Sequence, residues 1–227
     1  MADQFNYGDL FSADSRDAGP GAVRHSKYDF AVAYPDPGTL PLEELIDAVR
    51  TGFEREGKDL AYYSSPSGDP ELRKLVAEKL SRERNMTVTA DDMVLTSGSG
   101  EAIGIVIQAL TDPGDAVLVE EFVYLGTLNQ LRRYGADCVA IKCDDDGLKP
   151  EDLDKVITEQ KAAGKKVKYL YTIPAFQNPM GWTMSLERRK QVLEVTGKHG
   201  IPVFEDDCYA DLRFEGEDVT SFHSLDE

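Results

Sequence analysis

The stretch that decides the fold is residues 167–209, which read VKYLYTIPAFQNPMGWTMSLERRKQVLEVTGKHGIPVFEDDCY. Val167 to Tyr171 is a short apolar run, and Pro202 to Phe204 is another. Between them, Leu186 to His199 has the length and spacing of a helix. A strand, a helix and a second strand in this order predict two neighbouring strands of a parallel sheet.

Signals at both ends support that helix, because Ser185 is a typical N-cap and Gly200 a typical C-cap. The same alternation of short apolar runs and helices extends back to about Asp91. The earlier runs are Met93–Leu95, Ala116–Val119 and Cys138–Ile141, and the helices are Glu101–Leu110, Leu125–Arg133 and Glu151–Gln160. The sequence therefore predicts an α/β fold whose parallel sheet is covered by helices on both faces and binds ligands at the strands' C-terminal ends.

The first 90 residues lack this alternation. Residues 1–30 are polar, contain Gly and Pro and have no periodicity, which predicts an arm. A helix is expected from about Leu42, with apolar residues on one face as far as Phe53. A second helix is expected after Asp69, which would cap it, with Pro70 at its first position.

Composition narrows the range of partners. The 227 residues include 25 basic and 42 acidic side chains, a net charge of -17. Such a surface repels nucleic-acid phosphates and anionic membranes, so neither is an expected partner. No signal peptide and no run of about 20 apolar residues is found, which predicts a cytoplasmic protein. The three cysteines and three histidines fit neither a disulfide framework nor a metal site.

A small-residue turn follows the run Met93–Leu95. Thr96 to Gly100 reads TSGSG and leads into an apolar helix. Free N–H groups at the start of that helix, with close backbone approach at Gly98 and Gly100 and a hydroxyl at Ser99, would suit an anion. The spacing matches neither the dinucleotide fingerprint nor a P-loop. The alternative is a tight turn that only connects two elements.

Two further runs also end in polar residues. Val167 to Tyr171 leads to an Asn-Pro step, where a cis bond would fix Asn178 so that its amide could meet a ligand oxygen. The alternative is an ordinary turn. Pro202 to Phe204 ends in an acidic stretch containing Asp206, where a carboxylate could hold a cationic ring nitrogen with Tyr209 nearby. The alternative there is a solvated acidic loop.

Together these motifs resemble the class I/II aminotransferases, which are fold-type-I enzymes dependent on pyridoxal 5'-phosphate (PLP). The resemblance extends from about Phe30 to the end of the chain and is nearest to the aromatic/2-aminoadipate branch. The motifs are Tyr63-Ser-Ser-Pro-Ser-Gly68-x-x-x-Leu72-Arg73, Ser97-Gly-Ser-Gly100, Asp112-Pro-Gly-Asp115, Glu120-x-x-x-Tyr124, Gln177-Asn-Pro-x-Gly181 and Asp206-x-x-Tyr209.

The resemblance implies a PLP-transferase fold of type I, with a mostly parallel sheet between layers of helices. Residues 1–60 would form an N-terminal arm and part of the small domain, and residues 61–227 an incomplete PLP-binding large domain. The implied activity is transfer of an amino group from an α-amino acid, aromatic or 2-aminoadipate-like, to a 2-oxo acid. Such enzymes act in amino acid metabolism and biosynthesis, and a homodimer is expected.

The resemblance also assigns residues to the cofactor phosphate. The phosphate would sit on the backbone of Gly98, Ser99 and Gly100. Tyr63 of one subunit would reach the phosphate bound by its partner.

Four other residues are assigned to the cofactor ring. Tyr124 would stack on the pyridine ring, and Asn178 and Tyr209 would hydrogen-bond its phenolic oxygen. Asp206 would keep the pyridine nitrogen protonated, which makes the ring an electron sink. Asp207 is the alternative carboxylate, although the Asp-x-x-Tyr spacing favours Asp206.

Several positions depart from the family pattern. Ala33 stands near a common Gly, Phe122 replaces a frequent Pro, and Met180 replaces the Thr of Asn-Pro-Thr-Gly. The family's Schiff-base lysine lies downstream of Asp-x-x-Tyr, and this chain has no lysine after Asp206. We therefore expect that lysine to lie beyond Glu227. The chain would then be a truncated product or a partial sequence and would be inactive by itself.

Other functions stay open at this point. One is the effector domain of an aminotransferase-like transcription regulator, although the acidic balance disfavours DNA contact. Another is a PLP-dependent lyase or decarboxylase, because the same strand-end residues would serve those reactions.

Overall fold

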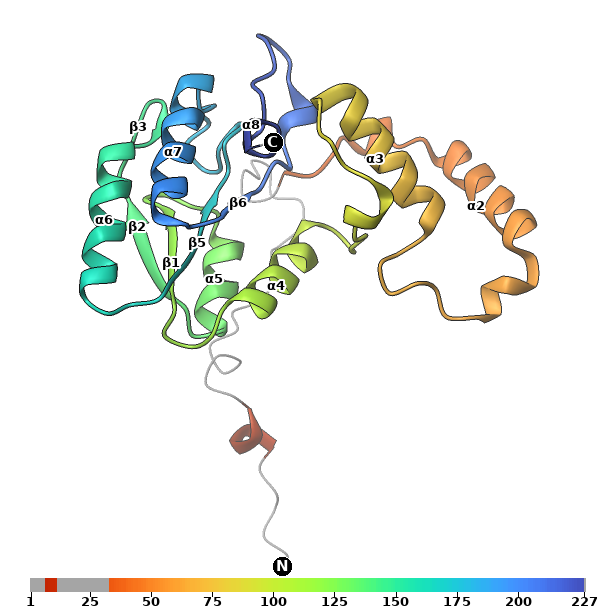
Figure 1. Ribbon diagram of the computed structural model, residues 1–227. Coiled ribbons are helices and arrows are strands. Elements are labelled where there is room, and N and C mark those ends of the chain that lie inside the picture. The colour runs from red at the N-terminus through yellow and green to blue at the C-terminus, as the bar shows by residue number, and fades with distance from the viewer. Residues whose placement is uncertain (1–6, 12–32, 227) are drawn as a thin grey trace, which may run out of the picture. The chain divides into compact units, whose positions relative to one another are not determined.

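The computed structural model describes residues 7–11 and 33–226 (Figure 1). The predicted arm, residues 1–30, therefore lies mostly outside the described residues. The chain divides into two units, Met1–Ser64 and Ser65–Glu227. Each unit is described by itself.

The first unit is helical in its described part. Its elements are η1 (Tyr7–Leu10), η2 (Pro37–Thr39), α2 (Leu42–Glu56) and η3 (Gly57–Ala61). Helix α2 begins at Leu42, as predicted. Within this unit its apolar face, from Leu42 to Phe53, is exposed.

The second unit contains the predicted alternation of strands and helices. Two of its parallel strands, β5 and β6, come from the stretch 167–209. The elements are α3 (Pro70–Arg84), η4 (Ala90–Asp92), α4 (Ser99–Leu110), β1 (Ala116–Glu120), α5 (Leu125–Arg133), β2 (Asp137–Ile141), β3 (Cys143–Asp144), β4 (Gly147–Leu148), α6 (Pro150–Ala162), β5 (Val167–Thr172), α7 (Leu186–His199), β6 (Val203–Glu205), η5 (Ala210–Leu212) and α8 (Phe222–Asp226).

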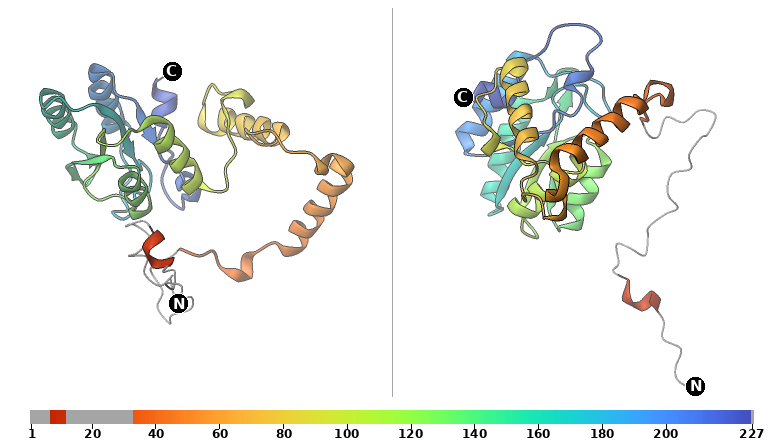
Figure 2. Two further views of the ribbon diagram at one scale, coloured as in Figure 1. Left: turned by 90° about the horizontal axis from the view of Figure 1, so that it is seen from below. Right: turned by 90° about the vertical axis from the view of Figure 1, so that its right-hand side faces the viewer.

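A four-stranded sheet with the order β2-β1-β5-β6 forms the centre of this unit, and all its pairs are parallel. Leu118 and Leu170 pack on one face in a core shared with α6 and α7. Val119 and Tyr171 pack on the other face with residues of α4 and α5. Figures 1 and 2 show the helices on the two sides of the sheet. The predicted parallel sheet with helices on both faces is confirmed. Alternate residues of a strand point to opposite faces, so each central strand contributes to both cores.

The predicted helix caps are also present. The Asp69 carboxylate accepts the Leu72 amide at 2.8 Å, and Ser185 Oγ accepts the Arg188 amide at 3.2 Å. Gly200 ends α7 in the left-handed conformation with φ 65°. The side chains of Asp69 and Ser185 thus satisfy amide groups that the first helical turn leaves without partners.

The predicted strand Met93–Leu95 is wrong. Met93 has an extended backbone, but this segment forms no strand, and the Leu95 amide donates instead to Ser67 O in a loop at 3.0 Å. No strand among residues 33–226 pairs with it. An apolar run indicates burial or extension, whereas a strand also needs a neighbouring backbone to complete its hydrogen bonds.

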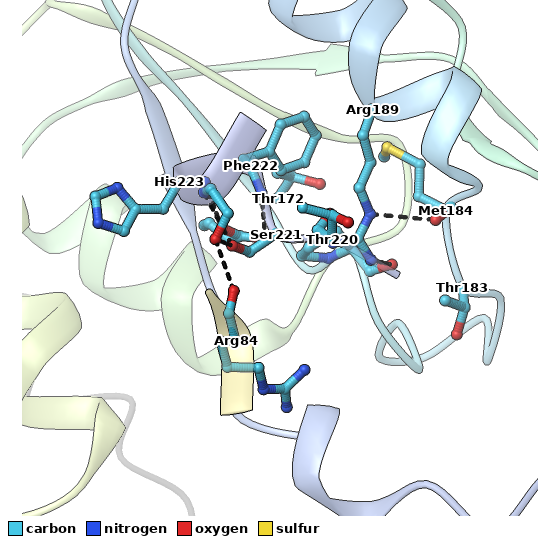
Figure 3. Close-up of polar contacts among 12 residues, drawn as sticks. Arg84, Thr172, Thr183, Met184, Arg189, Thr220, Ser221, Phe222 and His223 are labelled. Carbon is cyan, nitrogen blue, oxygen red and sulfur yellow. Dashed lines mark hydrogen bonds and ion pairs between the residues drawn. The ribbon is translucent and has the colours of Figure 1, made fainter. Parts of the chain in front are cut away.

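Arg189, a buried arginine, connects the segment that follows β5 to the segment that precedes α8. Arg189 of α7 is 2 % exposed and donates to the carbonyl oxygens of Pro174 at 3.1 Å, Met184 at 3.2 Å and Thr220 at 3.1 Å (Figure 3). Its Nη1 also lies 3.5 Å from the carboxylate of Glu205. A buried charge needs such partners, and here they connect the ends of β5 and β6 to one helix.

The same carboxylate connects α8 to the sheet. Glu205 accepts the amides of Phe222 at 3.1 Å and His223 at 3.3 Å. Ser224 Oγ donates to Arg84 O, at the end of α3, at 2.9 Å (Figure 3). The segment after β6 is therefore held at both of its ends. Among the described helices, none has the length and apolar character needed to cross a bilayer.

Candidate functional site

The C-terminal ends of β1, β5 and β6 lie along one edge of the sheet. Tyr171 pairs with Phe204 and Thr172 with Glu205, so β5 and β6 end side by side. The amide of Asp206 donates to Thr172 O at 2.9 Å, which places the residue after β6 against the end of β5. Glu120, the last residue of β1, also bonds to Thr172 through its side chain.

Asp206 is held by a buried tyrosine. Its side chain is 9 % exposed, and Oδ2 accepts the Tyr171 hydroxyl at 2.6 Å. Thr127 Oγ1 of α5 donates to the same hydroxyl at 3.0 Å. Burial, and then the nearby Asp206, raise the pKa of Tyr171 far above its ordinary value. The phenol therefore stays protonated and acts as a donor.

Asp207, the alternative carboxylate, is in different electrostatic surroundings. Burial, and then Glu205, raise its pKa to about 6, while Arg84 and Arg189 act in the opposite direction. Asp207 therefore interacts mainly with charged side chains, whereas Asp206 is held by the neutral hydroxyl of Tyr171.

Asn178 and Tyr209, which the resemblance assigns to one ring oxygen, contact each other. Asn178 Nδ2 donates to the Tyr209 hydroxyl at 3.2 Å. The Asn178-Pro179 peptide bond is cis, as the sequence suggested. Two loops that are far apart in sequence thus bring an amide and a phenol together.

Glu120, which the sequence placed in a motif without assigning it a role, is a buried carboxylate near these loops. Glu120 is 1 % exposed and accepts from Thr172 Oγ1, from the Ile173 amide at 3.1 Å and from Gln177 Nε2 at 2.7 Å. Burial raises its pKa to about 7; the three hydrogen bonds lower it only in part, and the charge of Asp206 raises it further. The available signal was a charged residue at the end of the apolar run Ala116–Val119.

Gln177 connects Glu120 to the segment before α5. Its Nε2 also donates to Phe122 O at 2.6 Å, and its Oε1 accepts the Met180 amide at 2.8 Å. One side chain therefore holds the loop of Asn178 and the loop of Tyr124 in a common arrangement.

Tyr124 precedes α5 and keeps part of its ring in the open. Its side chain is 44 % exposed. A Cβ atom at Gly126 would overlap the ring, so the ring lies over the first turn of α5 only because residue 126 is glycine. The exposed aromatic surface is available for stacking.

The turn before α4 has the features expected of an anion site. Gly98 has φ 90°, a conformation that favours glycine, and helix α4 begins at Ser99. Among the hydrogen bonds between described residues, the Ser99 and Gly100 amides donate to no acceptor. The carboxylate of Glu101 accepts the Ser97 amide at 2.5 Å and leaves those two amides free.

Most of the residues predicted for the site belong to the second unit and are connected through α5. Gly100 O accepts Gln130 Nε2 at 3.0 Å, which connects the turn before α4 to α5. Through Thr127 and Tyr171, α5 is also connected to Asp206. Tyr63 lies in the first unit and is fully exposed. Ala33 is likewise exposed in that unit.

Comparison with known proteins identifies this arrangement. Residues 31–227 match the family described as aminotransferase class I and II. The aromatic-amino-acid aminotransferase 1 of Thermococcus litoralis is 34% identical over 193 residues, which cover 85% of this chain and 46% of that protein. The mitochondrial kynurenine/alpha-aminoadipate aminotransferase of Bos taurus is 27% identical, over 98% of this chain and 59% of that protein.

A solved structure shows the same fold. The kynurenine aminotransferase of Pyrococcus horikoshii, crystallised in complex with PMP, matches with a TM-score of 0.80 and 31% identity, over 96% of this chain and 56% of that one. This chain spans about half the length of the curated relatives that it matches. The match over residues 31–227 shows that the chain belongs to the class I and II aminotransferase family.

Proposed function

We propose that this chain forms the cofactor-binding part of a PLP-dependent aminotransferase. The reaction would move an amino group from an aromatic or 2-aminoadipate-like amino acid to a 2-oxo acid. The observation that carries the proposal is the buried carboxylate of Asp206, which lies at the same sheet edge as the Asn178–Tyr209 pair. The substrate class is supported by relatives named for aromatic amino acids and for kynurenine and alpha-aminoadipate.

The donor and acceptor groups at this edge fit the cofactor. A phosphate needs N–H donors, which the free amides of Ser99 and Gly100 supply at the start of α4. A protonated ring nitrogen needs a buried carboxylate, which is Asp206. Asn178 and Tyr209 would hold the phenolic oxygen.

Each residue would bind, orient or hold a proton. Tyr124 would cover one face of the ring, and Asp206 would keep a proton on the ring nitrogen. When bound, the cofactor supplies a ring that accepts electrons from the substrate carbon that loses its proton. None of the residues assigned to this site is a lysine, so proton transfer at that carbon is assigned to none of them.

The proposal extends to the assembly. Residues 61–227 would form the large domain, and residues 1–60 the arm with part of the small domain. A cytoplasmic homodimer would place Tyr63 of one subunit at the phosphate of its partner, and the exposure of Tyr63 is compatible with this role.

Binding of pyridoxamine 5'-phosphate (PMP) to residues 1–227 tests the proposal, because PMP needs no lysine. Calorimetry should show saturable binding, and Asp206→Asn should weaken it about 10- to 100-fold, the usual effect of losing a charged hydrogen bond. Asp145→Asn, an exposed carboxylate in the β3–β4 turn, is the control and should bind as the unmodified chain does. No binding, or equal affinity for both variants, would refute the proposal.

The reaction type needs a separate measurement. With the whole protein, phenylalanine and 2-aminoadipate should each yield the matching 2-oxo acid when a 2-oxo acid acceptor is present. Decarboxylated or cleaved products would favour a lyase or decarboxylase instead.

A further inference from the structure

We infer that Tyr171, supported by Thr127, is a positioning residue that presents the Asp206 carboxylate to the protonated ring nitrogen of the cofactor. This inference rests on the proposed function, because the ring belongs to PLP or PMP. Tyr171 would not touch the cofactor but would act through Asp206.

The direction of the hydrogen bonds carries the first step. Tyr171 has one hydroxyl proton, and Thr127 Oγ1 donates to that hydroxyl from 3.0 Å. The proton of Tyr171 is therefore directed to Asp206 Oδ2, at 2.6 Å. A neutral hydroxyl donating to a charged carboxylate over this distance is among the stronger hydrogen bonds in proteins.

The rigidity of Tyr171 carries the second step. Its strand, β5, lies between β1 and β6, and its side chain is fully buried. Its ring also meets the Phe204 ring edge-on, with centroids 5.4 Å apart. A hydroxyl on such a ring has a fixed position, so the carboxylate that it holds is fixed as well.

The effect on the ring proton follows from these two steps. The hydrogen bond uses one lone pair of Oδ2, and the carboxylate, which also interacts with the Cys208 thiol, keeps lone pairs for a further donor. Because Tyr171 holds the carboxylate in a fixed position, the N–H of a protonated ring meets an acceptor directly, which favours the protonated form of the ring. Among the described residues, Glu120, Cys208 and Tyr209 are further titratable groups that interact with Asp206.

The same strand provides a matched control. Tyr169 is also buried, and its hydroxyl lies 3.0 Å from Thr111 Oγ1. Its ring meets the Phe204 ring edge-on at 6.2 Å. Tyr169→Phe thus removes a buried, threonine-bonded hydroxyl from the same face of β5, without removing a partner of Asp206.

The test uses PMP labelled with ¹⁵N in its ring, bound to residues 1–227 at pH 7.5. In the unmodified chain and in Tyr169→Phe, the ¹⁵N signal should lie at the position of a protonated ring. In Tyr171→Phe it should move toward the position of an unprotonated ring. Thr127→Val should move it in the same direction by a smaller amount.

The outcomes separate the two proposals. If the unmodified chain binds no PMP, the proposed function fails and this inference fails with it. If PMP binds and its ring is protonated, but Tyr171→Phe gives the same signal, the inference alone is overturned. If Tyr171→Phe does not fold, Thr127→Val decides, and an unchanged signal in that variant overturns the inference.

Discussion

Glu120 allows a quantitative test of the buried site, through the substitution Glu120→Gln. Burial raises the pKa of Glu120 from 4.5 to about 7. The folded chain therefore binds this proton more tightly than the unfolded chain does. Its contribution to stability is fully present below about pH 4.5 and is lost as the pH rises through about 7.

The size of this effect follows from the two pKa values. Since one pKa unit corresponds to about 1.4 kcal/mol, the free energy of unfolding should fall by about 3 kcal/mol over this range because of Glu120. Gln cannot ionise, so the variant lacks this loss. Its amide group would instead face Gln177 Nε2, which also donates, and that conflict costs about 1–3 kcal/mol at every pH.

The ionisation of Glu120 and the donor conflict in the variant together predict a difference in free energy of unfolding that depends on pH. Glu120→Gln should be less stable than the unmodified chain at pH 5, and the gap should shrink or reverse by pH 8. Urea unfolding followed by circular dichroism at several pH values measures it. Glu121→Gln, at the neighbouring exposed glutamate, should run parallel to the unmodified chain.

A constant gap would refute this reasoning. The quantity compared is the difference in free energy of unfolding between Glu120→Gln and the unmodified chain. If this difference changes by less than about 0.5 kcal/mol from pH 5 to pH 8, Glu120 does not titrate in that range. The buried carboxylate would then be fully stabilised by its three hydrogen-bond donors.

Two further predictions concern the support of the site. Arg189→Met should lower the free energy of unfolding by about 3–5 kcal/mol, because three carbonyl groups and a carboxylate lose their buried partner. Arg82→Met, at an exposed arginine, should change it by less than about 0.5 kcal/mol in the same urea titration. Gly126→Ala should weaken PMP binding in calorimetry, since the new Cβ displaces the Tyr124 ring. Gly197→Ala in α7, which meets no neighbour, should leave binding unchanged and raise stability by about 0.5–1 kcal/mol; equal PMP affinities for the two glycine variants would contradict the proposed role of Tyr124.

Local signals were sufficient for most of the fold. The runs and periodicities between Ala116 and Phe204 predicted all four strands of the sheet, and the caps at Asp69 and Ser185 are present. Met93–Leu95 has the same local pattern and is not a strand, because pairing depends on a distant segment that the pattern does not contain.

For the site, the motifs and the family resemblance predicted which residues to consider. They did not predict that Asn178 donates to Tyr209, nor that Glu120 and Gln177 join two loops. Those contacts depend on how close the ends of β1, β5 and β6 come together, and strand register is a tertiary property.

Tyr169 and Tyr171 show most clearly which features cannot be predicted from the sequence. By sequence alone, both are aromatic residues of one apolar strand, two positions apart and therefore on the same face. Their different roles come from the parallel pairing of β5 with β6, which sets Asp206 beside Tyr171 while Tyr169 meets Thr111. The sequence alone determined a buried parallel strand with two tyrosines, and only the tertiary structure decided which hydroxyl holds a carboxylate, because that depends on the register between two strands separated by a whole helix.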